Sequence, residues 1–182
     1  MAVESKHDLI TLLLEDHREV EDLFVLFDVM PGKWDELFPE LVRALVHHEV
    51  AEEEIVYPQV RTCLPMGDQM ADDRMAEQSQ AEELLRKMER TGTRGAGFGA
   101  DLMELRTSVL AHAEIEELQV FAPLRAVLEP TERERLAARY QRAKSIAPAH
   151  PHPHVPDTPP GDIAVGSVAA LADGIRGAIH GS

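Results

Sequence analysis

Two segments of the chain carry a histidine four residues ahead of a glutamate, in closely similar surroundings. One is LVHHEVAEE, with His48 and Glu52, and the other is VLAHAEIEE, with His112 and Glu116. On an α-helix this spacing puts the imidazole and the carboxylate on one face, a turn apart. Two such helices facing each other would offer two pairs of ligands. The pattern therefore predicts a pair of metal ions inside a helical bundle.

A third histidine, His17, lies in a segment whose apolar residues recur at helical spacing. Leu13, Val20 and Phe24 share its face, so we expect the imidazole to point toward the core. The matching segment at residues 77–85 has glutamine, Gln78, in the equivalent place. Imidazole and carboxylate ligands suit iron, manganese or zinc, and two carboxylates able to bridge favour a dinuclear site. Without a metal, such buried charges would be strongly destabilising.

The residues around these candidates receive less specific interpretations. His47 is turned away from His48 around the helix and is interpreted as an ordinary surface histidine. Arg18 and the acidic neighbours of the histidines are expected to lie around the centre or at the surface; these are Glu15, Asp16, Glu49 and Glu53.

The elements that must position these residues are helical. Apolar periodicity and proline or glycine breaks predict four long helices, at about residues 6–29, from 34 to the break at 65–67, 68–90 and 100–128. The second helix is expected to break or kink at Tyr57-Pro58, and the fourth to bend at Pro123. A short fifth helix is expected from Pro130 to Lys144. Because short connections make sequential helices antiparallel neighbours, we predict an all-α, up-down-up-down four-helix bundle.

The composition changes abruptly after these helices. Proline and histidine dominate the residues that follow Ala147, which predicts an extended linker rather than packed structure. Weak helical periodicity beyond it predicts at most a short terminal helix, with apolar residues Val168, Leu171, Ile175 and Ile179. We therefore expect a bundle domain at residues 1–146 and a Pro/His-rich tail at residues 147–182, whose partner the sequence does not indicate.

Charge and composition exclude several functional classes. The formal net charge is −15, with 33 acidic against 18 basic side chains, which argues against a nucleic-acid partner and an anionic membrane surface. No apolar run approaches the ~20 residues of a membrane span. With a single cysteine, Cys63, and no basic-then-apolar leader, we expect a cytoplasmic protein.

These motifs resemble the hemerythrin-like, or hemerythrin HHE cation-binding domain, family. Its pattern places His, His-x-x-x-Glu, His and His-x-x-x-Glu on four successive helices, and the resemblance covers about residues 6–128. It implies a centre of two iron ions joined by an oxo or hydroxo bridge. The implied ligands are His17, His48, Glu52, His112 and Glu116, with the two glutamates as bridges.

Gln78 departs from that family pattern, which places a histidine there. An amide is a poorer iron ligand, so either a position stays open or another side chain fills it. Tyr57 is our candidate: it lies off the ligand face of an ideal helix, but Pro58 is expected to push it out of the α-helical region. The chain resembles actinobacterial hemerythrin-like proteins in this respect. The alternative is a packing residue, matched by Phe121 in the second repeat.

A phenolate ligand would stabilise ferric iron and shift the expectation away from reversible oxygen carriage. We expect a di-iron protein that acts on a small oxidant, with possible peroxidase or catalase-like activity on peroxide, or activity on nitric oxide or oxygen. The alternatives are an oxygen or nitric oxide sensor or carrier, an iron store, and a metal-free helical interaction module. A store is disfavoured because the chain offers one closed site.

Overall fold

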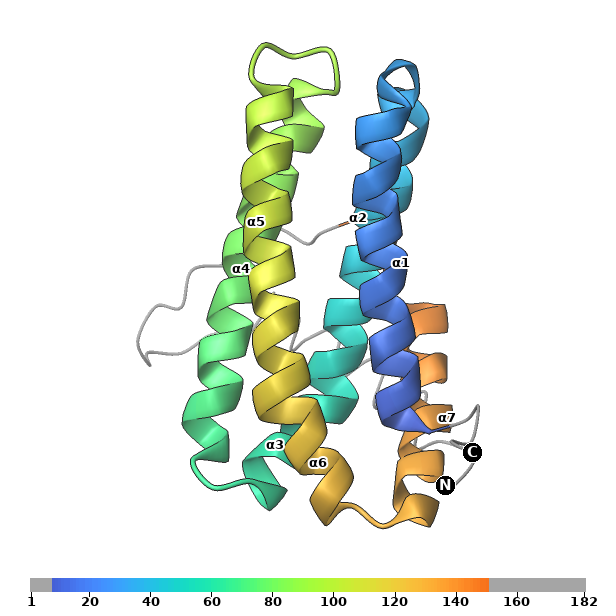
Figure 1. Ribbon diagram of the computed structural model, residues 1–182, viewed down its shortest axis with the longest axis vertical. Coiled ribbons are helices and arrows are strands. Elements are labelled where there is room, and N and C mark those ends of the chain that lie inside the picture. The colour runs from blue at the N-terminus through green and yellow to red at the C-terminus, as the bar shows by residue number, and fades with distance from the viewer. Residues whose placement is uncertain (1–7, 151–182) are drawn as a thin grey trace, which may run out of the picture.

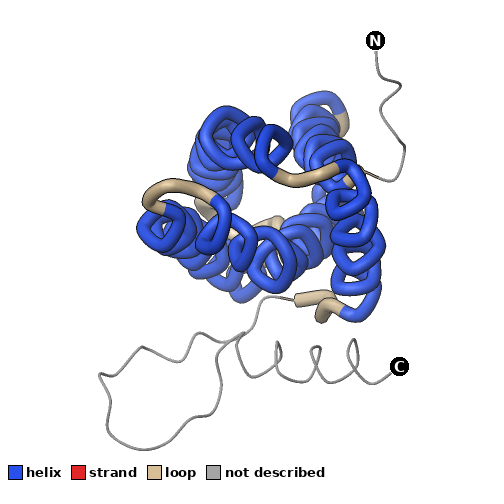
Figure 2. The backbone as a smooth tube through the Cα atoms, turned by 90° about the horizontal axis from the view of Figure 1, so that it is seen from below, coloured by secondary structure: helices blue, strands red, loops and turns tan. Residues whose placement is uncertain are grey.

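Four long helical segments form an antiparallel bundle in the computed structural model, which describes residues 8–150. Consecutive segments run in opposite directions (Figure 1), and a view along their axes shows them around a common centre (Figure 2). No strand occurs among the described residues. The predicted all-α, up-down-up-down bundle is confirmed, and its segments are α1 (Leu9–Val29), α2 (Trp34–Ala51) continuing into α3 (Tyr57–Cys63), α4 (Gly67–Thr91), and α5 (Phe98–Glu116) continuing into α6 (Ala122–Val127).

Local sequence signals explain where several of these helices begin and end. The Asp8 side chain caps α1 by accepting a hydrogen bond from the backbone N–H of Ile10 at 3.0 Å. A 3₁₀ turn at Pro31–Lys33 separates α1 from α2. Between α3 and α4 the chain passes so close to Val60 that a Cβ on Gly67 would collide with its backbone oxygen. Only glycine fits this turn without a shift of the backbone.

Two π-helical turns stand where the sequence predicted a break and a bend. η2 (Glu52–Val56) joins α2 to α3, and η3 (Glu117–Phe121) joins α5 to α6. Each lies directly before a proline-containing helix start, at Pro58 and Pro123. A proline ring collides with the carbonyl four residues earlier in an α-helix, and a π turn pairs that backbone differently, through bonds between residues five apart. The helices therefore continue instead of breaking.

The expected fifth helix is present as α7 (Pro130–Ile146). It packs on the outside of the bundle against α1 and α2 (Figure 1). The tail is predicted to begin at residue 147; most of its linker and all of its terminal helix fall in residues 151–182, which lie outside the described residues.

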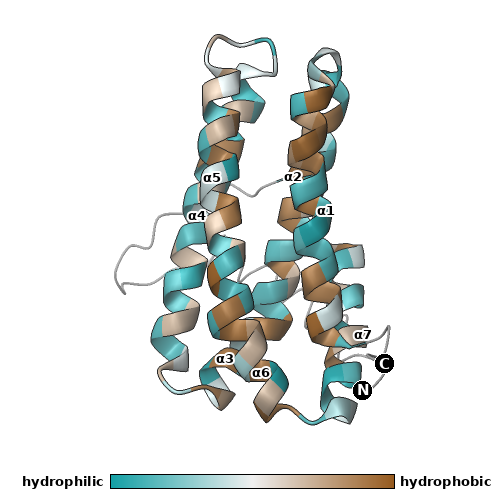
Figure 3. Cartoon of the chain, in the orientation of Figure 1, coloured by the Kyte–Doolittle hydropathy of each residue, from teal (hydrophilic) through white to brown (hydrophobic). Residues whose placement is uncertain are grey.

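Hydrophobic packing in the bundle is divided into two clusters. One surrounds α3, α6 and α7, and the other lies toward the opposite end, around Phe24, Phe38 and Phe98. Of the long helices, α1, α2 and α4 are amphipathic, and hydrophobic and hydrophilic residues alternate along the bundle in the hydropathy colouring (Figure 3). Buried polar residues occupy the level between the two clusters, including His17, His48 and Glu52. Within residues 8–150, no helix is both long and apolar enough to cross a membrane.

Candidate metal centre

All four long segments of the bundle contribute to one buried polar cluster. His17 comes from α1, and His48 and Glu52 come from the end of α2 and the start of η2. α4 contributes Gln78, and α5 contributes its pair, His112 and Glu116. Both glutamates are fully buried, and His17, His48 and Gln78 are at most 5% exposed. The structure thus brings together every ligand candidate on these helices.

The ligand atoms of the cluster converge. Single donor atoms of His17, His48, Glu52 and Glu116 all lie within 4.8 Å of one another. Each predicted pair is in contact along its own helix, at 3.3 Å between His48 Nε2 and Glu52 Oε1 and at 3.2 Å between His112 Nε2 and Glu116 Oε2. His17 Nε2 lies 3.5 Å from Glu116 Oε2. The arrangement matches the spacing argument made from the two repeats.

The outer nitrogens of the three histidines are all engaged by other side chains. His17 Nδ1 donates to Glu117 at 3.0 Å, and His112 Nδ1 donates to Glu77 at 2.8 Å. His48 Nδ1 donates to the hydroxyl of Tyr140 at 2.8 Å. When an imidazole is neutral, as a metal ligand must be, such a contact places its proton on Nδ1 and leaves Nε2 as a lone-pair donor facing the centre.

A cation fits the atoms that remain. Within residues 8–150, the polar atoms of the cluster that find no hydrogen-bond partner are His17 Nε2, His48 Nε2, His112 Nε2, Glu52 Oε1, Glu116 Oε2 and Gln78 Oε1. Buried polar atoms are ordinarily paired, and an unpaired one destabilises the fold. Six of them facing one region, from nitrogen and oxygen donors, form a set that metal ions bind.

The electrostatics of the two buried glutamates differ without a cation. Burial and the nearby charges of Glu116 and Glu49 raise the pKa of Glu52 well above its usual range. Burial acts the same way on Glu116, but the neighbouring histidines outweigh it and lower the pKa of that carboxyl. The pKa values of the two carboxyl groups are thus shifted in opposite directions, so the proton is held more tightly on Glu52 than on Glu116.

Tyr57 points into the cluster, but not for the predicted reason. Its backbone is α-helical, with φ −63° and ψ −31°, so the expected departure from the α region at Pro58 is wrong. The π turn brings the side chain inward instead: the N–H of Tyr57 bonds to the carbonyl of Glu52, five residues earlier. That turn takes one residue more than an α turn, so Tyr57 lies where residue 56 otherwise would.

The Tyr57 hydroxyl donates a hydrogen bond to Glu116 Oε1 at 2.9 Å and is buried. Burial and the charges of Glu52 and Glu116 raise the pKa of Tyr57 well above 10. The residue is therefore a neutral phenol in the metal-free chain. The phenol oxygen still lies against the same carboxylate that faces His17 and His112.

Sequence reasoning missed three residues that support the histidines. Glu77 and Glu117 carried a weak signal, because each is the chain neighbour of a cluster residue. Tyr140 carried none, since α7 lies outside the four-helix pattern. Its hydroxyl accepts from His48 and donates to Asp16 at 2.6 Å, and Lys144 holds the other oxygen of Asp16 at 2.7 Å. Burial would raise the pKa of Asp16, but these contacts lower it to about 2.

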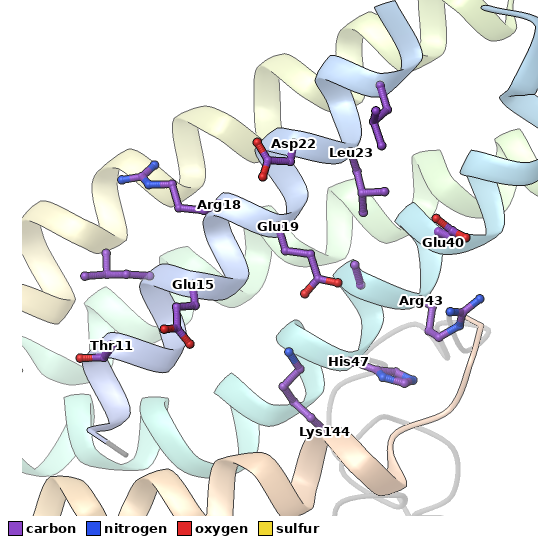
Figure 4. A pocket seen from close by; sticks show the side chains of 13 residues that line it. Thr11, Glu15, Arg18, Glu19, Asp22, Leu23, Glu40, Arg43, His47 and Lys144 are labelled. Atoms are coloured by element: carbon purple, nitrogen blue, oxygen red, sulfur yellow. The ribbon is translucent and has the colours of Figure 1, made fainter. Parts of the chain in front are cut away.

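Two pockets lie near these elements. A cavity of about 250 Å³ borders His17, His48, Gln78 and His112. A wider pocket of about 820 Å³ opens between α1, α2 and α7, where His47 and Lys144 face it (Figure 4). His47 therefore lies on this outer face, apart from the cluster.

Comparison with known protein families agrees with this geometry. The model of the hemerythrin HHE cation binding domain matches residues 8–124. The chain belongs to the hemerythrin family. The hemerythrin domain thus spans the four long segments that carry the cluster, so the cluster is the place where this cation-binding domain would hold its metal. Gln78, in α4, remains the departure from the family's histidine pattern.

Two curated proteins are similar to this hemerythrin domain. An uncharacterized hemerythrin-like protein of Schizosaccharomyces pombe is 31% identical over 145 residues, which cover 79% of this chain and 70% of that protein. A DNA nickase of Nostoc sp. is 31% identical over 132 residues, or 71% of this chain, but the match spans only 37% of the nickase. No solved structure matches the chain significantly.

Proposed function

We propose that this protein holds two iron ions in the cluster and acts on a small oxidant, namely peroxide, nitric oxide or oxygen. The observation that carries the proposal is the set of six buried atoms, supplied by four helical segments, that converge without making a hydrogen bond. The two His–Glu pairs support two ions rather than one, because each pair offers a chelate and each glutamate has a second oxygen. Mixed imidazole and carboxylate donors suit iron.

The proposed ligands are His17, His48, Glu52, His112 and Glu116, with Tyr57 as a further candidate. Two irons bound there would supply the electron-transfer chemistry that such oxidants require. The surrounding side chains orient the ligands: Gln78 donates from its amide nitrogen to Glu52 Oε2 at 2.8 Å. The hydrophobic clusters pack on either side of the centre along the bundle and fix the helices that carry the ligands.

The unpartnered atoms also bear on the alternatives. A metal-free interaction module would keep these buried donors without compensation, at a cost in stability that apolar substitutions would remove. A sensor or carrier role would involve the tail, and it stays a prediction. DNA nicking is not proposed for this chain, because the match covers a minor part of the nickase and the net charge of −15 repels phosphate. We propose a cytoplasmic location.

Metal analysis of the purified protein tests the proposal. We expect about two irons per chain, as a dinuclear centre requires. His48→Ala should lower the iron content, and His47→Ala, the neighbouring histidine on the outer face, should leave it unchanged. Iron well below one per chain, with zinc in its place, would contradict the di-iron assignment.

Visible spectroscopy of Tyr57→Phe tests the tyrosine separately. If the phenolate binds ferric iron, the wild-type protein has a phenolate-to-iron charge-transfer band, and the variant lacks it. The variant retains the aromatic ring, so the packing of α3 is preserved. An unchanged spectrum would exclude Tyr57 as a ligand and leave it as the donor to Glu116.

A further inference from the structure

The cavity beside the centre extends well beyond the histidines. Its volume is about 250 Å³, and it lies among α1, α2, α4 and α5. Apart from the cluster residues, its inner walls are mostly apolar, with Val20, Leu45, Ala81, Val109 and Ala113. Exposed residues at its edge, among them Gln80 and Ser108, mark where it meets the surface.

This cavity is larger than the proposed oxidants need. Peroxide, nitric oxide and oxygen each have only two heavy atoms, whereas an apolar cavity of about 150 Å³ accommodates a benzene molecule. Two metal ions among the Nε2 atoms would occupy only a small part of the space. The remaining volume matches a small organic molecule, and the apolar walls match a hydrocarbon.

One polar group in the cavity wall, the Glu49 carboxyl group, has an oxygen without a hydrogen-bond partner in the described part of the chain. Glu49 is 6% exposed and lines the cavity. That oxygen is its Oε2 atom. A ligand that combines a hydrocarbon body with a hydroxyl group would satisfy this atom and fill the apolar volume together.

We infer that the cavity binds a small organic hydroperoxide, or the alcohol of the same skeleton, with its hydrocarbon part between α4 and α5 and its terminal O–H group at Glu49. The inference deepens the proposed function, since it names the peroxide as an organic one. It is an assignment of a binding site: the apolar walls select the hydrocarbon group, and Glu49 orients the oxygen end toward the histidines.

Calorimetric titration with benzyl alcohol, an unreactive probe of this class, tests the site in the full-length protein as purified. Ala81→Phe fills the cavity from α4 and should weaken binding by about tenfold or more. Ala76→Phe adds the same ring to the exposed face of that helix and should leave binding unchanged. Val109→Phe, on the partly exposed α5 wall, provides a second filling variant if Ala81→Phe does not fold.

The role of Glu49 is tested by comparing benzyl alcohol with toluene. Glu49→Leu should weaken benzyl alcohol about fivefold, the effect of one lost hydrogen bond, and should not weaken toluene. Absence of binding to the wild-type protein, or equal binding to a folded filling variant, would overturn the inference.

Iron content measured on the same samples separates the two proposals. Two irons without alcohol binding would refute the cavity assignment alone. The wild-type protein could instead contain no iron, bind benzyl alcohol and lose that binding in the filling variants. This result would refute the di-iron function and support the organic binding site.

Discussion

The three histidines of the centre differ in what holds their outer nitrogens. The carboxylates that hold His17 and His112 are partly exposed, at 25% for Glu117 and 37% for Glu77. His48 instead contacts a buried tyrosine from α7. Such outer contacts fix the imidazole tautomer and ring orientation, so they govern metal affinity without touching the metal.

Removing one of these contacts should therefore weaken metal binding. We expect Glu77→Ala to lower the metal affinity by about 10- to 100-fold, because His112 loses the acceptor of its Nδ1 proton. Glu83→Ala, an exposed glutamate on the same helix, is the matched control. Competition with a chromogenic chelator measures both. Equal affinities in the two variants would show that Glu77 does not position His112.

Tyr140→Phe tests the outer contact of His48, which comes from α7 rather than from one of the four long segments. The variant keeps the ring but removes the hydroxyl that links His48 to Asp16. Leaving buried partners unsatisfied should reduce the free energy of unfolding by roughly 1–3 kcal/mol, besides weakening the metal. Chemical denaturation of the metal-free protein isolates the first effect. A free energy of unfolding equal to that of the wild type would mean that the direct contact of His48 Nδ1 with Asp16 Oδ2, at 3.4 Å, is sufficient to satisfy His48.

At the scale of elements, the π turns decide which side chains face the centre after each His–Glu pair. Both lie just before a proline, and both bring an aromatic ring inward: Tyr57 from one, and Phe121, whose ring lies 5.2 Å from that of His17, from the other. Sequence periodicity treats such a segment as an ideal α-helix and therefore misplaces every residue after it. The repeats differ at this position, tyrosine against phenylalanine, so only one offers a phenol.

Deleting one residue from a π turn should restore α-helical phase. We expect deletion of Glu53 to leave Tyr57 facing Glu116 and to retain any phenolate band, because Tyr57 already lies where residue 56 of an uninterrupted α-helix would lie and its N–H then bonds to Glu52 four residues earlier. Deletion of Ala96, in the exposed loop between α4 and α5, controls for chain shortening. Loss of the Tyr57 signal from a folded deletion variant would show that the π geometry itself, rather than the place of the residue on the helix, orients the ring.

At the scale of the whole molecule, α7 completes the centre although it lies outside the bundle. Truncation after His150 keeps every contact described above, and we expect its melting temperature and metal content to equal those of the full chain. Truncation after Leu128 also removes Tyr140 and uncovers the hydrophobic cluster around α3 and α6. We expect it to lose stability and metal affinity together. Thermal unfolding and metal analysis of both truncated proteins test these expectations. Loss of metal from the protein truncated after His150 would assign the tail a role in the centre.

Bound metal should stabilise the whole fold, because the ligands converge only in the folded chain. At a free metal concentration a hundred times the dissociation constant, binding adds about 2.7 kcal/mol. For a chain of this size that corresponds to a rise in Tm of roughly 5–10 °C. Scanning calorimetry before and after chelation measures it, with His47→Ala as a control that should shift equally. An unchanged Tm would mean that the purified protein held no metal.

The sequence alone was sufficient for the bundle and for the two His–Glu pairs, because helical periodicity and four-residue spacing are local properties. It also placed His17 inward, through the apolar residues on its face. Only the tertiary structure decided the rest. The π turn sets the orientation of Tyr57, and the packing of α7 against α1 and α2 brings Tyr140 to His48. Those contacts join residues far apart in the chain, or depend on a change of helical phase, and no local pattern records either.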